Sequence, residues 1–407
     1  MTHWAEDPLT PVAWRRPHAS TLPVTGAWRP GQPFGERRFM LTALDRPFVL
    51  EGGGQLREVT VCFETWGELN ADASNAILVC HALTGDAHAA GPVGPGQPTA
   101  GWWDDMIGPG RPIDTDQLYV VCANVLGGCQ GSTGPASTRL DGKAPYGSSF
   151  PVVSVRDMVR VQARLADTLG VTRWAAVIGG SMGGMQALEW AVMFPKRVGA
   201  LVAIATCTAA TAQQIAYWST GRRAIALDPG WRHGDYYDAE PGDGPHDGLA
   251  LARMFSQITF RTDEVFTDRF GRGAVEPIVA PFQIWQRFEV ERYLEYHGHK
   301  LARRFDANTY LLLTKAMDLH DIGRGRGGVA SALRRVTAPT LSMGVSSDAL
   351  YPSYQQRELA DGLAATGVDA TYAEIDSPHG HDAFLLEADQ TRAALTSFFD
   401  RLEIPHG

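Results

Sequence analysis

A short glycine-rich segment places one serine at a sharp turn between an expected strand and an expected helix. Residues 179–184 read Gly-Gly-Ser-Met-Gly-Gly; an apolar run precedes them at 174–178, and residues 185–191, which lack glycine and proline, follow them. Small residues two positions before and after Ser181 let the turn close without a Cβ clash. The helix N-terminus would then direct free N–H groups toward charge developing near Ser181. The pattern predicts Ser181 as a nucleophile; the alternative is an idle serine in a glycine-rich turn.

The bulk properties of the chain exclude several classes of protein. With 407 residues and 44% apolar content, the chain is long enough for one large core with an insertion, or for two domains. A net charge of −9 argues against a broad nucleic-acid surface. No apolar stretch approaches the roughly 18 residues that a membrane span needs. The first residues lack a basic stretch followed by an apolar run, so we expect no secretory signal.

The five cysteines indicate neither a disulfide framework nor a structural zinc site. They are scattered along the chain, with no C-x-x-C pair, at positions 62, 80, 122, 129 and 207. Their odd number and irregular spacing are atypical of both kinds of site. Three of them, Cys62, Cys80 and Cys122, lie in strand-like runs, where buried free thiols are expected. We therefore expect no metal, and a reducing cytoplasm fits best.

Strand-like runs alternate with helix-like runs over much of the chain. The strand-like runs are residues 59–64, 76–80, 118–123, 175–178, 200–205, 340–345 and 370–375. Helix-like runs between several of them include residues 155–169, 186–193 and 354–363. Such alternation predicts the α/β class, with a mostly parallel sheet covered by helices on both faces.

The alternation fails in two places, which suggests how the chain is divided. Residues 1–45, rich in proline, arginine and tryptophan, are expected to form a loosely ordered N-terminal arm. Residues 206–332 contain helix-like pieces interrupted by a polar, glycine-rich segment. We expect them to form a helical lid over the carboxyl edge of the sheet, where open α/β sheets bind ligands. Residues 46–205 and 333–407 would then make the core.

Partners for Ser181 occur late in the chain and in the order typical of α/β-hydrolases, serine, then an acid, then histidine. A serine hydroxyl is a weak nucleophile until a base removes its proton. Asp348 follows the strand-like run 340–345, where a carboxylate would orient a histidine; a solvated loop aspartate is the alternative. Two histidines compete for the role of base, and order alone favours His381 over His379 because His381 directly precedes an apolar run.

An oxyanion formed at Ser181 would also need hydrogen-bond donors. The residue after the nucleophile supplies one in this class of fold, and a loop after an earlier strand supplies the other. We therefore predict the backbone N–H groups of Met182 and Leu83. Leu83 lies in the segment 81–85, which follows the strand-like run 76–80. A plain strand exit remains an alternative interpretation of that segment.

These segments together resemble the homoserine O-acetyltransferase family over about residues 48–390. G-x-S-x-G alone is shared by many hydrolases, but the combined set is far more specific. The matching segments are Glu64-Thr65-Trp66-Gly67, residues 81–86, Gly101-Trp102-Trp103-Asp104, residues 124–129, residues 131–135, residues 179–184, His320-Asp321-Ile322-Gly323-Arg324-Gly325 and residues 380–385.

The resemblance implies an α/β-hydrolase core with a helical lid, paired as a homodimer through the lids. It implies acetyl transfer from acetyl-CoA, bound as a co-substrate, to L-homoserine, a step toward methionine. The triad carries over as Ser181, Asp348 and His381. Two substrate contacts also carry over: Arg253 for the homoserine carboxylate and Asp382 for its ammonium group. An arginine fork suits a carboxylate, and an aspartate pairs with an amine. Without the resemblance, Arg253 would be interpreted as a solvated helix residue.

The chain departs from the family pattern at one position near Arg253. A tyrosine that is common in the family is Phe260 here, so a hydroxyl group is lost and acceptor preference would change if that hydroxyl orients substrate. Arg324 and Arg326 lie among glycines, where a turn or a lid hinge is the default interpretation and contact with CoA phosphates the alternative.

Three other functions compete with acetyl transfer to L-homoserine, and each differs from it more than the one before. The nearest is the same chemistry with succinyl-CoA as donor or L-serine as acceptor. The second is an esterase, in which water replaces the acceptor; Arg253 and Asp382 argue against it, because a hydrolase needs no clamp for a zwitterion. The third is a non-catalytic binding or scaffold protein, which an ordered serine, aspartate and histidine disfavour.

Overall fold

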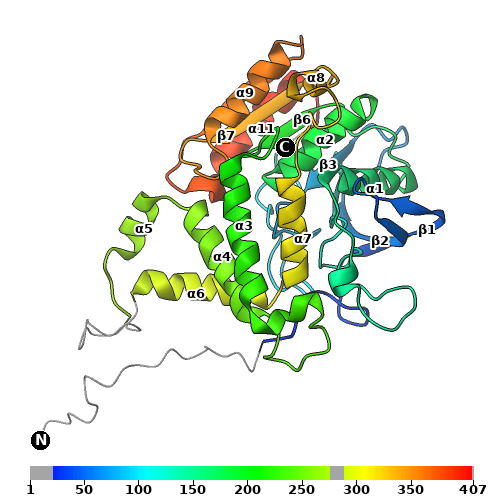
Figure 1. Ribbon diagram of the computed structural model, residues 1–407. Coiled ribbons are helices and arrows are strands. Elements are labelled where there is room, and N and C mark those ends of the chain that lie inside the picture. Colours follow the sequence, from blue (N-terminus) through cyan, green and yellow to red (C-terminus); the bar gives the residue numbers. More distant parts are fainter. Residues whose placement is uncertain (1–21, 276–287, 406–407) are drawn as a thin grey trace, which may run out of the picture.

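The centre of the molecule is one eight-stranded sheet. A computed structural model describes residues 22–275 and 288–405. The strand order is β1-β2-β4-β3-β5-β6-β7-β8 (Figure 1). The strands are β1 (Arg38–Val49), β2 (Gln55–Trp66), β3 (Ala76–Cys80), β4 (Tyr119–Ala123), β5 (Ala176–Gly180), β6 (Leu201–Ile204), β7 (Thr340–Val345) and β8 (Ala370–Ile375). β1 and β2 run antiparallel to their neighbours and every other pair is parallel, which confirms the predicted class.

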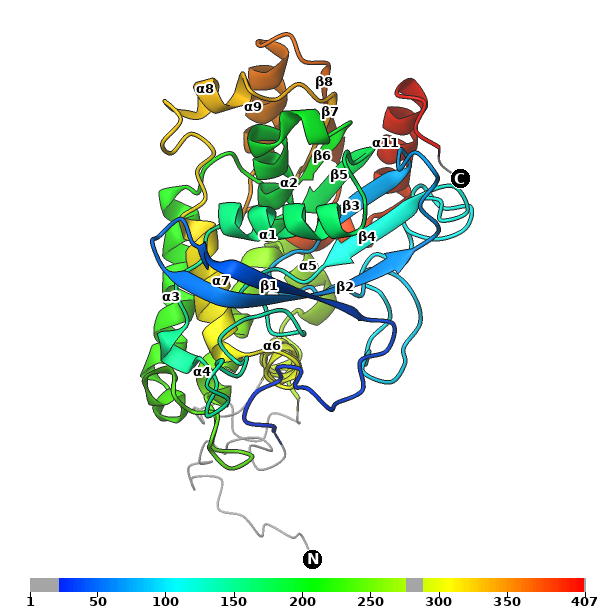
Figure 2. The same cartoon turned by 90° about the vertical axis from the view of Figure 1, so that its right-hand side faces the viewer.

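Alternate side chains of the central strands enter two separate apolar cores. Val177 on β5 belongs to one core, and the adjacent Ile178 belongs to the other, because successive side chains of a strand point to opposite faces. One core packs against α1 (Val155–Thr168), α2 (Met182–Met193) and α9 (Ser353–Ala364). The other packs against α11 (Ala388–Arg401) and residues 87–118. The helices therefore cover both faces of the sheet (Figure 2).

The chain between β6 and β7 is mainly helical, and it packs on the carboxyl ends of the strands. Its helices are α3 (Ala212–Leu227), α4 (His246–Phe260), α5 (Asp263–Phe270), α6 (Glu289–Ala302), α7 (Ala307–Asp318) and α8 (Val329–Leu333). Figure 1 shows α3, α4, α6 and α7 grouped beside the sheet. Arg304 donates a hydrogen bond to the Thr84 carbonyl oxygen, just after β3, and Gln214 donates one to the Leu350 carbonyl oxygen, just after β7.

The N-terminal region differs from the loosely ordered arm expected over residues 1–45. Residues 1–21 lie outside the described part of the chain. From Arg38, however, the backbone pairs with β2, with a shift of register between Ala43 and Phe48. Leu22 is buried, and the Gly26 N–H donates to the Phe305 carbonyl oxygen. For residues 22–45 the expectation is corrected, because backbone pairing and lid contacts order a segment whose composition resembles a loop.

All five cysteines are buried free thiols. Among the residues that the structure describes, no helix is both long enough and apolar enough to cross a membrane. In the same residues, no group of three or more histidine, cysteine, aspartate or glutamate side chains is arranged to hold a metal ion.

Candidate active site

Ser181 lies at a tight turn that only glycine can support on either side. It is the N-cap of α2, directly after β5, and its backbone is held at φ 56° and ψ −124°. A Cβ on Gly179 would lie 2.2 Å from the Gly183 carbonyl oxygen, and a Cβ on Gly183 would lie 2.1 Å from the Cys80 carbonyl oxygen. Both distances are far below van der Waals contact. A non-glycine residue at positive φ is uncommon and marks a strained, over-determined position.

Ser181, His381 and Asp348 form a continuous hydrogen-bonded chain. The Ser181 Oγ lies 3.0 Å from Nε2 of His381, and Nδ1 of His381 lies 2.7 Å from Oδ2 of Asp348. All three residues are buried. They come from separate parts of the sheet edge: the turn after β5, the loop after β7, and the short 3-10 helix Gly380–Asp382 after β8. A base within hydrogen-bond reach of a serine, itself oriented by a carboxylate, is the arrangement that activates a hydroxyl nucleophile.

The His381 imidazole is enclosed by aromatic side chains and electrostatically bound to Asp348. The ring centroids of Tyr351, Phe260 and Phe384 lie 5.2, 5.5 and 5.7 Å from the centroid of the imidazole. Burial lowers the pKa of His381, but the Asp348 carboxylate outweighs burial by charge and hydrogen bonding, so the pKa lies above its ordinary value. An imidazolium formed at this position would therefore be stabilised.

The predicted oxyanion donors lie on two segments that hydrogen bonds tie together. Met182 is the first residue of α2, where backbone N–H groups have no intrahelical acceptor. Leu83 lies in the loop after β3. The Gln186 side chain donates to the His81 carbonyl oxygen in that loop, at 3.2 Å, and to the Met182 carbonyl oxygen, at 3.1 Å. The loop and the helix therefore hold a fixed relative position, as an oxyanion site requires.

His81 fixes the same loop from the other side. The Val125 N–H donates to Nε2 of His81 at 3.2 Å, so the ring proton is on Nδ1, which donates to the Ala82 carbonyl oxygen at 2.8 Å. Burial lowers the pKa of His81, with the Ala82 hydrogen bond acting in the opposite direction. A neutral imidazole suits this structural role.

Arg253 lies on lid helix α4, next to the Phe260 ring. Its Cζ lies 5.4 Å from the centroid of the Phe260 ring. Among the described residues it has no hydrogen bond and no ion pair. Burial lowers the pKa of Arg253, and the Asp382 carboxylate opposes that shift most strongly. Burial, together with Arg253, Lys300 and Arg261, also lowers the pKa of His297 to about 4. Positive charge therefore gathers on this side of the lid, facing Asp382.

Asp382 follows the histidine of the triad and has a partner that sequence reasoning missed. Its Oδ2 lies 2.9 Å from Nη2 of Arg261, at the end of α4. Arg261 directly follows Phe260, but nothing in the sequence around it indicated a binding residue, because an arginine at the end of a helix is usually solvated. The two candidate acceptor contacts, Arg253 and Asp382, thus approach the triad from the lid and from the core respectively.

Arg324 and Arg326 are occupied in contacts with the core. Nη2 of Arg326 lies 2.8 Å from Oε2 of the buried Glu189 on α2, and Nη2 of Arg324 lies 3.2 Å from Oε2 of Glu51. Arg156 on α1 bridges the same two carboxylates at 2.9 Å each. This network anchors the end of the lid to α1 and α2, in keeping with the interpretation of a turn or hinge.

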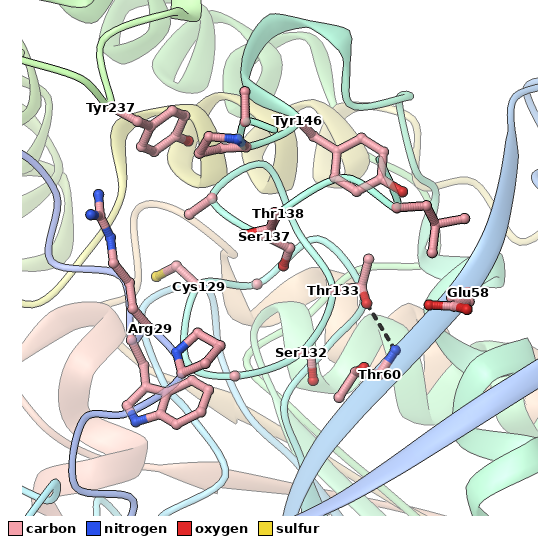
Figure 3. Close-up of a pocket in the computed structure, with 18 of the residues that line it drawn as sticks. Arg29, Glu58, Thr60, Cys129, Ser132, Thr133, Ser137, Thr138, Tyr146 and Tyr237 are labelled. Atoms are coloured by element: carbon pink, nitrogen blue, oxygen red, sulfur yellow. Dashed lines mark hydrogen bonds between the residues drawn. The ribbon is translucent and has the colours of Figure 1, made fainter. Parts of the chain in front are cut away.

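A pocket of about 840 Å³ lies apart from the triad (Figure 3). The loop after β4 forms one side of it, where Thr133 accepts a hydrogen bond from the backbone N–H of Thr60 at 2.8 Å. Tyr146, Tyr237 and Arg29 contribute larger side chains. Ser181, Asp348 and His381 are not among the described residues that line this pocket. This pocket is therefore separate from the hydrogen-bonded triad.

A serine–histidine–aspartate chain at a strand-to-helix turn of such a sheet defines an enzyme of the α/β-hydrolase class. Residues 75–388 match the family described as alpha/beta hydrolase fold. Related proteins identify the family within this class. The chain is 54% identical over 372 residues to the homoserine O-acetyltransferase of Thermobifida fusca, covering 91% of this chain and 95% of that protein. It is 51% identical over 352 residues to that of Carboxydothermus hydrogenoformans, covering 86% and 92%. The chain belongs to the homoserine O-acetyltransferase family.

Solved structures of enzymes with two different activities resemble this fold about equally well. The homoserine O-acetyltransferase of Bacillus anthracis superposes with a TM-score of 0.83 at 29% identity, covering 90% of this chain and 98% of that chain. Esterase E22 superposes with a TM-score of 0.82 at 31% identity, covering 89% and 99%. The fold therefore does not separate transfer to an acceptor from hydrolysis; the side chains around the triad must do so.

Proposed function

We propose that this protein transfers an acetyl group from acetyl-CoA to the hydroxyl of L-homoserine, releasing CoA and O-acetyl-L-homoserine for methionine synthesis. The observation that carries the proposal is the hydrogen-bonded triad together with the guanidinium of Arg253, which has no ion pair in the described part of the chain and whose charge interacts with the Asp382 carboxylate. This is the complement of an α-amino acid, which carries a carboxylate and an ammonium group. The names and identities of the relatives support the same acceptor.

In the first half-reaction, Ser181 would attack the thioester carbonyl of acetyl-CoA while His381 takes its proton. The resulting oxyanion would accept hydrogen bonds from the backbone N–H groups of Leu83 and Met182. Collapse of the tetrahedral intermediate breaks the carbon–sulfur bond. His381 returns its proton to the departing sulfur, so CoA leaves as a thiol and an acetyl ester remains on Ser181.

In the second half-reaction, His381 would take the proton of the acceptor hydroxyl, which attacks the acetyl ester. The bond to the Ser181 oxygen breaks, and His381 protonates that oxygen, which restores the enzyme. Arg253 would hold the acceptor carboxylate in a bidentate fork. Asp382 would hold the ammonium group. With both ends of the amino acid held, the hydroxyl reaches the ester in place of water.

Because residue 260 is phenylalanine and not tyrosine, no hydroxyl is present at this position to contact the acceptor carboxylate. The phenyl ring packs between the Arg253 guanidinium and the His381 imidazole. We propose that Phe260 retains this packing role and that Arg253 carries carboxylate recognition without help from that position.

The assembly of the molecule is also a proposal. We propose a core of residues 46–205 and 333–407, to which β1 adds the residues from Arg38, and a lid of residues 206–332. We also propose a homodimer formed through the lids. A reducing, cytoplasmic location is supported by the five buried free thiols. Sedimentation analysis of the purified protein tests the oligomeric state.

A four-way assay tests the proposed reaction. The purified protein is incubated with acetyl-CoA or succinyl-CoA and with L-homoserine or L-serine, and CoA release is followed with a thiol reagent. We expect acetyl-CoA with L-homoserine to be the fastest combination. Faster use of succinyl-CoA or of L-serine would reassign the donor or the acceptor. CoA release that does not depend on any amino acid would identify a hydrolase.

A further inference from the structure

The end of lid helix α4 is fastened to the loop that carries His381. Three consecutive lid residues make the contact. The Thr262 hydroxyl donates to the Pro378 carbonyl oxygen at 2.6 Å, and the Arg261 guanidinium lies 2.9 Å from Oδ2 of Asp382. The Phe260 carbonyl oxygen packs against Gly380, where a Cβ would lie only 2.5 Å away. We call residues 260–262, with these contacts, the α4 latch.

The α4 latch decides where the Asp382 carboxylate points. The closest approach of Arg261 to Asp382 is at Oδ2, and among the described residues no hydrogen bond engages Oδ1. The side chains of Arg261 and Asp382 are 14% and 22% exposed, so the pair is largely shielded from water. A charge pair in that setting is stronger and more directional than one on an open surface. One oxygen of Asp382 is thus fixed, and the other is left to accept from a ligand.

The same pair keeps the two ends of the acceptor clamp apart. Arg253 and Asp382, both within the described residues, have opposite charges that interact, yet no ion pair joins them. If Asp382 were not held by Arg261, it could rotate toward the unpartnered Arg253 guanidinium. That internal pair would occupy both of the groups that the acceptor needs. The ion pair with Arg261 would oppose this rotation, because it already compensates the charge of the Asp382 carboxylate.

We infer that Arg261 positions Asp382 for the acceptor's ammonium group, and so makes the acetyl-enzyme select α-amino acids over acceptors that lack the amine. The inference rests on the proposed function, because it assigns a determinant of acceptor choice within the same site. Arg261 acts through Asp382 and is a positioning residue; it takes no proton and forms no bond to substrate.

The test compares two acceptors that differ only in the amine. L-Homoserine has both charged groups, whereas 4-hydroxybutyrate keeps the carboxylate and hydroxyl but lacks the amine. The ratio of their kcat/KM values, with acetyl-CoA saturating, measures recognition of the amine. In Arg261→Gln we expect this ratio to fall by roughly 10- to 100-fold, the range for disturbing a shielded charge contact. Arg261→Lys should recover part of it, since an ammonium keeps the positive charge beside Asp382 but lacks the rigid planar geometry of a guanidinium.

Arg292→Gln is the matched control. Arg292 is a lid arginine on α6, 62% exposed and paired with Glu289 at 2.7 Å, away from the latch. It should leave the ratio unchanged. A purely structural role for Arg261 would lower both kcat/KM values together and leave their ratio unchanged, which overturns the inference. A ratio that rises in Arg261→Gln would show that Arg261 competes with the ammonium, which also overturns it.

Measurements on the wild-type protein distinguish a failure of this inference from a failure of the proposed function. If the wild type transfers acetyl to L-homoserine and Arg261→Gln keeps the wild-type ratio, only the role of Arg261 is wrong. If the wild type shows no preference for L-homoserine over 4-hydroxybutyrate, the proposed acceptor is wrong, and the role of Arg261 is wrong with it.

Discussion

Nδ1 of His381 lies 2.7 Å from Oδ2 of Asp348, although 33 residues separate them in the chain. The other carboxylate oxygen, Oδ1, accepts hydrogen bonds from the backbone N–H groups of Leu350 and Tyr351, at 2.8 and 2.9 Å. Asp348 is therefore held at both oxygens and can accept only from a protonated Nδ1. This leaves Nε2 unprotonated toward Ser181, which is the tautomer that a general base requires.

Asp348→Asn should preserve the packing and lose most of the activity. An asparagine amide can donate to Nδ1, which moves the ring proton to Nε2 and removes the base. The expected loss in kcat is on the order of 10⁴, as for the same change in other triads. Steady-state CoA release measures it. Asp376→Asn, on an exposed loop near by, is the control and should be close to wild type. An Asp348→Asn enzyme with more than about a tenth of normal turnover would contradict the assignment.

Ser181→Ala should abolish transfer and leave the fold intact, because it removes one hydroxyl and no packing atoms. Triad loss removes several orders of magnitude in rate. In the wild type, mass spectrometry after exposure to acetyl-CoA alone should find an acetyl group on Ser181. Transfer that continues while no adduct ever forms would instead indicate direct transfer in a ternary complex.

His381→Ala should be about as damaging as Ser181→Ala, because the two residues act as one unit. His379→Ala is the matched control. The His379 backbone takes part in the loop, since its N–H donates to the Ser377 hydroxyl at 3.1 Å, and alanine retains that contact. Its effect on kcat should therefore be small. The opposite ranking of the two variants would assign the base to His379.

The pH profile of acylation should reflect the raised pKa of His381. The base must be neutral to accept the Ser181 proton, so lowering the pH through its pKa removes activity. Because Asp348 raises that pKa despite burial, the acid limb should lie above the ordinary histidine value of about 6.5. Acylation by p-nitrophenyl acetate, followed from about pH 5 to 9, locates it. An acid limb below the ordinary value would mean that burial outweighs Asp348.

Arg253→Ala should damage the acceptor half-reaction selectively. Losing one partner of a shielded charge pair costs roughly 2–5 kcal/mol, or tens- to thousands-fold in kcat/KM for L-homoserine. Acylation of Ser181 by acetyl-CoA should change little, and hydrolysis of the acetyl-enzyme should become more prominent. Arg253→Lys should rescue only partly, because an ammonium cannot form the fork. Rapid-mixing measurement of the two half-reactions decides the matter; a collapse of acylation with normal use of homoserine would move Arg253 to the donor side.

Local signals in the chain predicted a large part of this structure. The strands at 76–80, 340–345 and 370–375 have the predicted bounds, because each is a short β-prone run with turn-forming residues close by. The turn at Ser181 was predicted because its glycines are needed within a few residues of one another. β1 was missed because its pairing partner, β2, and the lid contacts of residues 22–28 supply the order that composition does not indicate.

In the candidate site, too, the sequence predicted some features and left others to the tertiary structure. The sequence by itself determined the turn that carries Ser181, since the strand, turn and helix around it are contiguous. It also predicted Ser181 as the nucleophile and the order of acid and base after it, since that order reflects the chain's path through the sheet. Only the tertiary structure decided that Arg261 pairs with Asp382, that three aromatic rings enclose His381, and that Arg253 has no ion pair within residues 22–275 and 288–405. The reason is physical: the Arg261–Asp382 and Phe260–His381 contacts join the lid to the core across more than 100 residues. Their strength depends on burial and distance, which exist only once the lid has packed on the sheet.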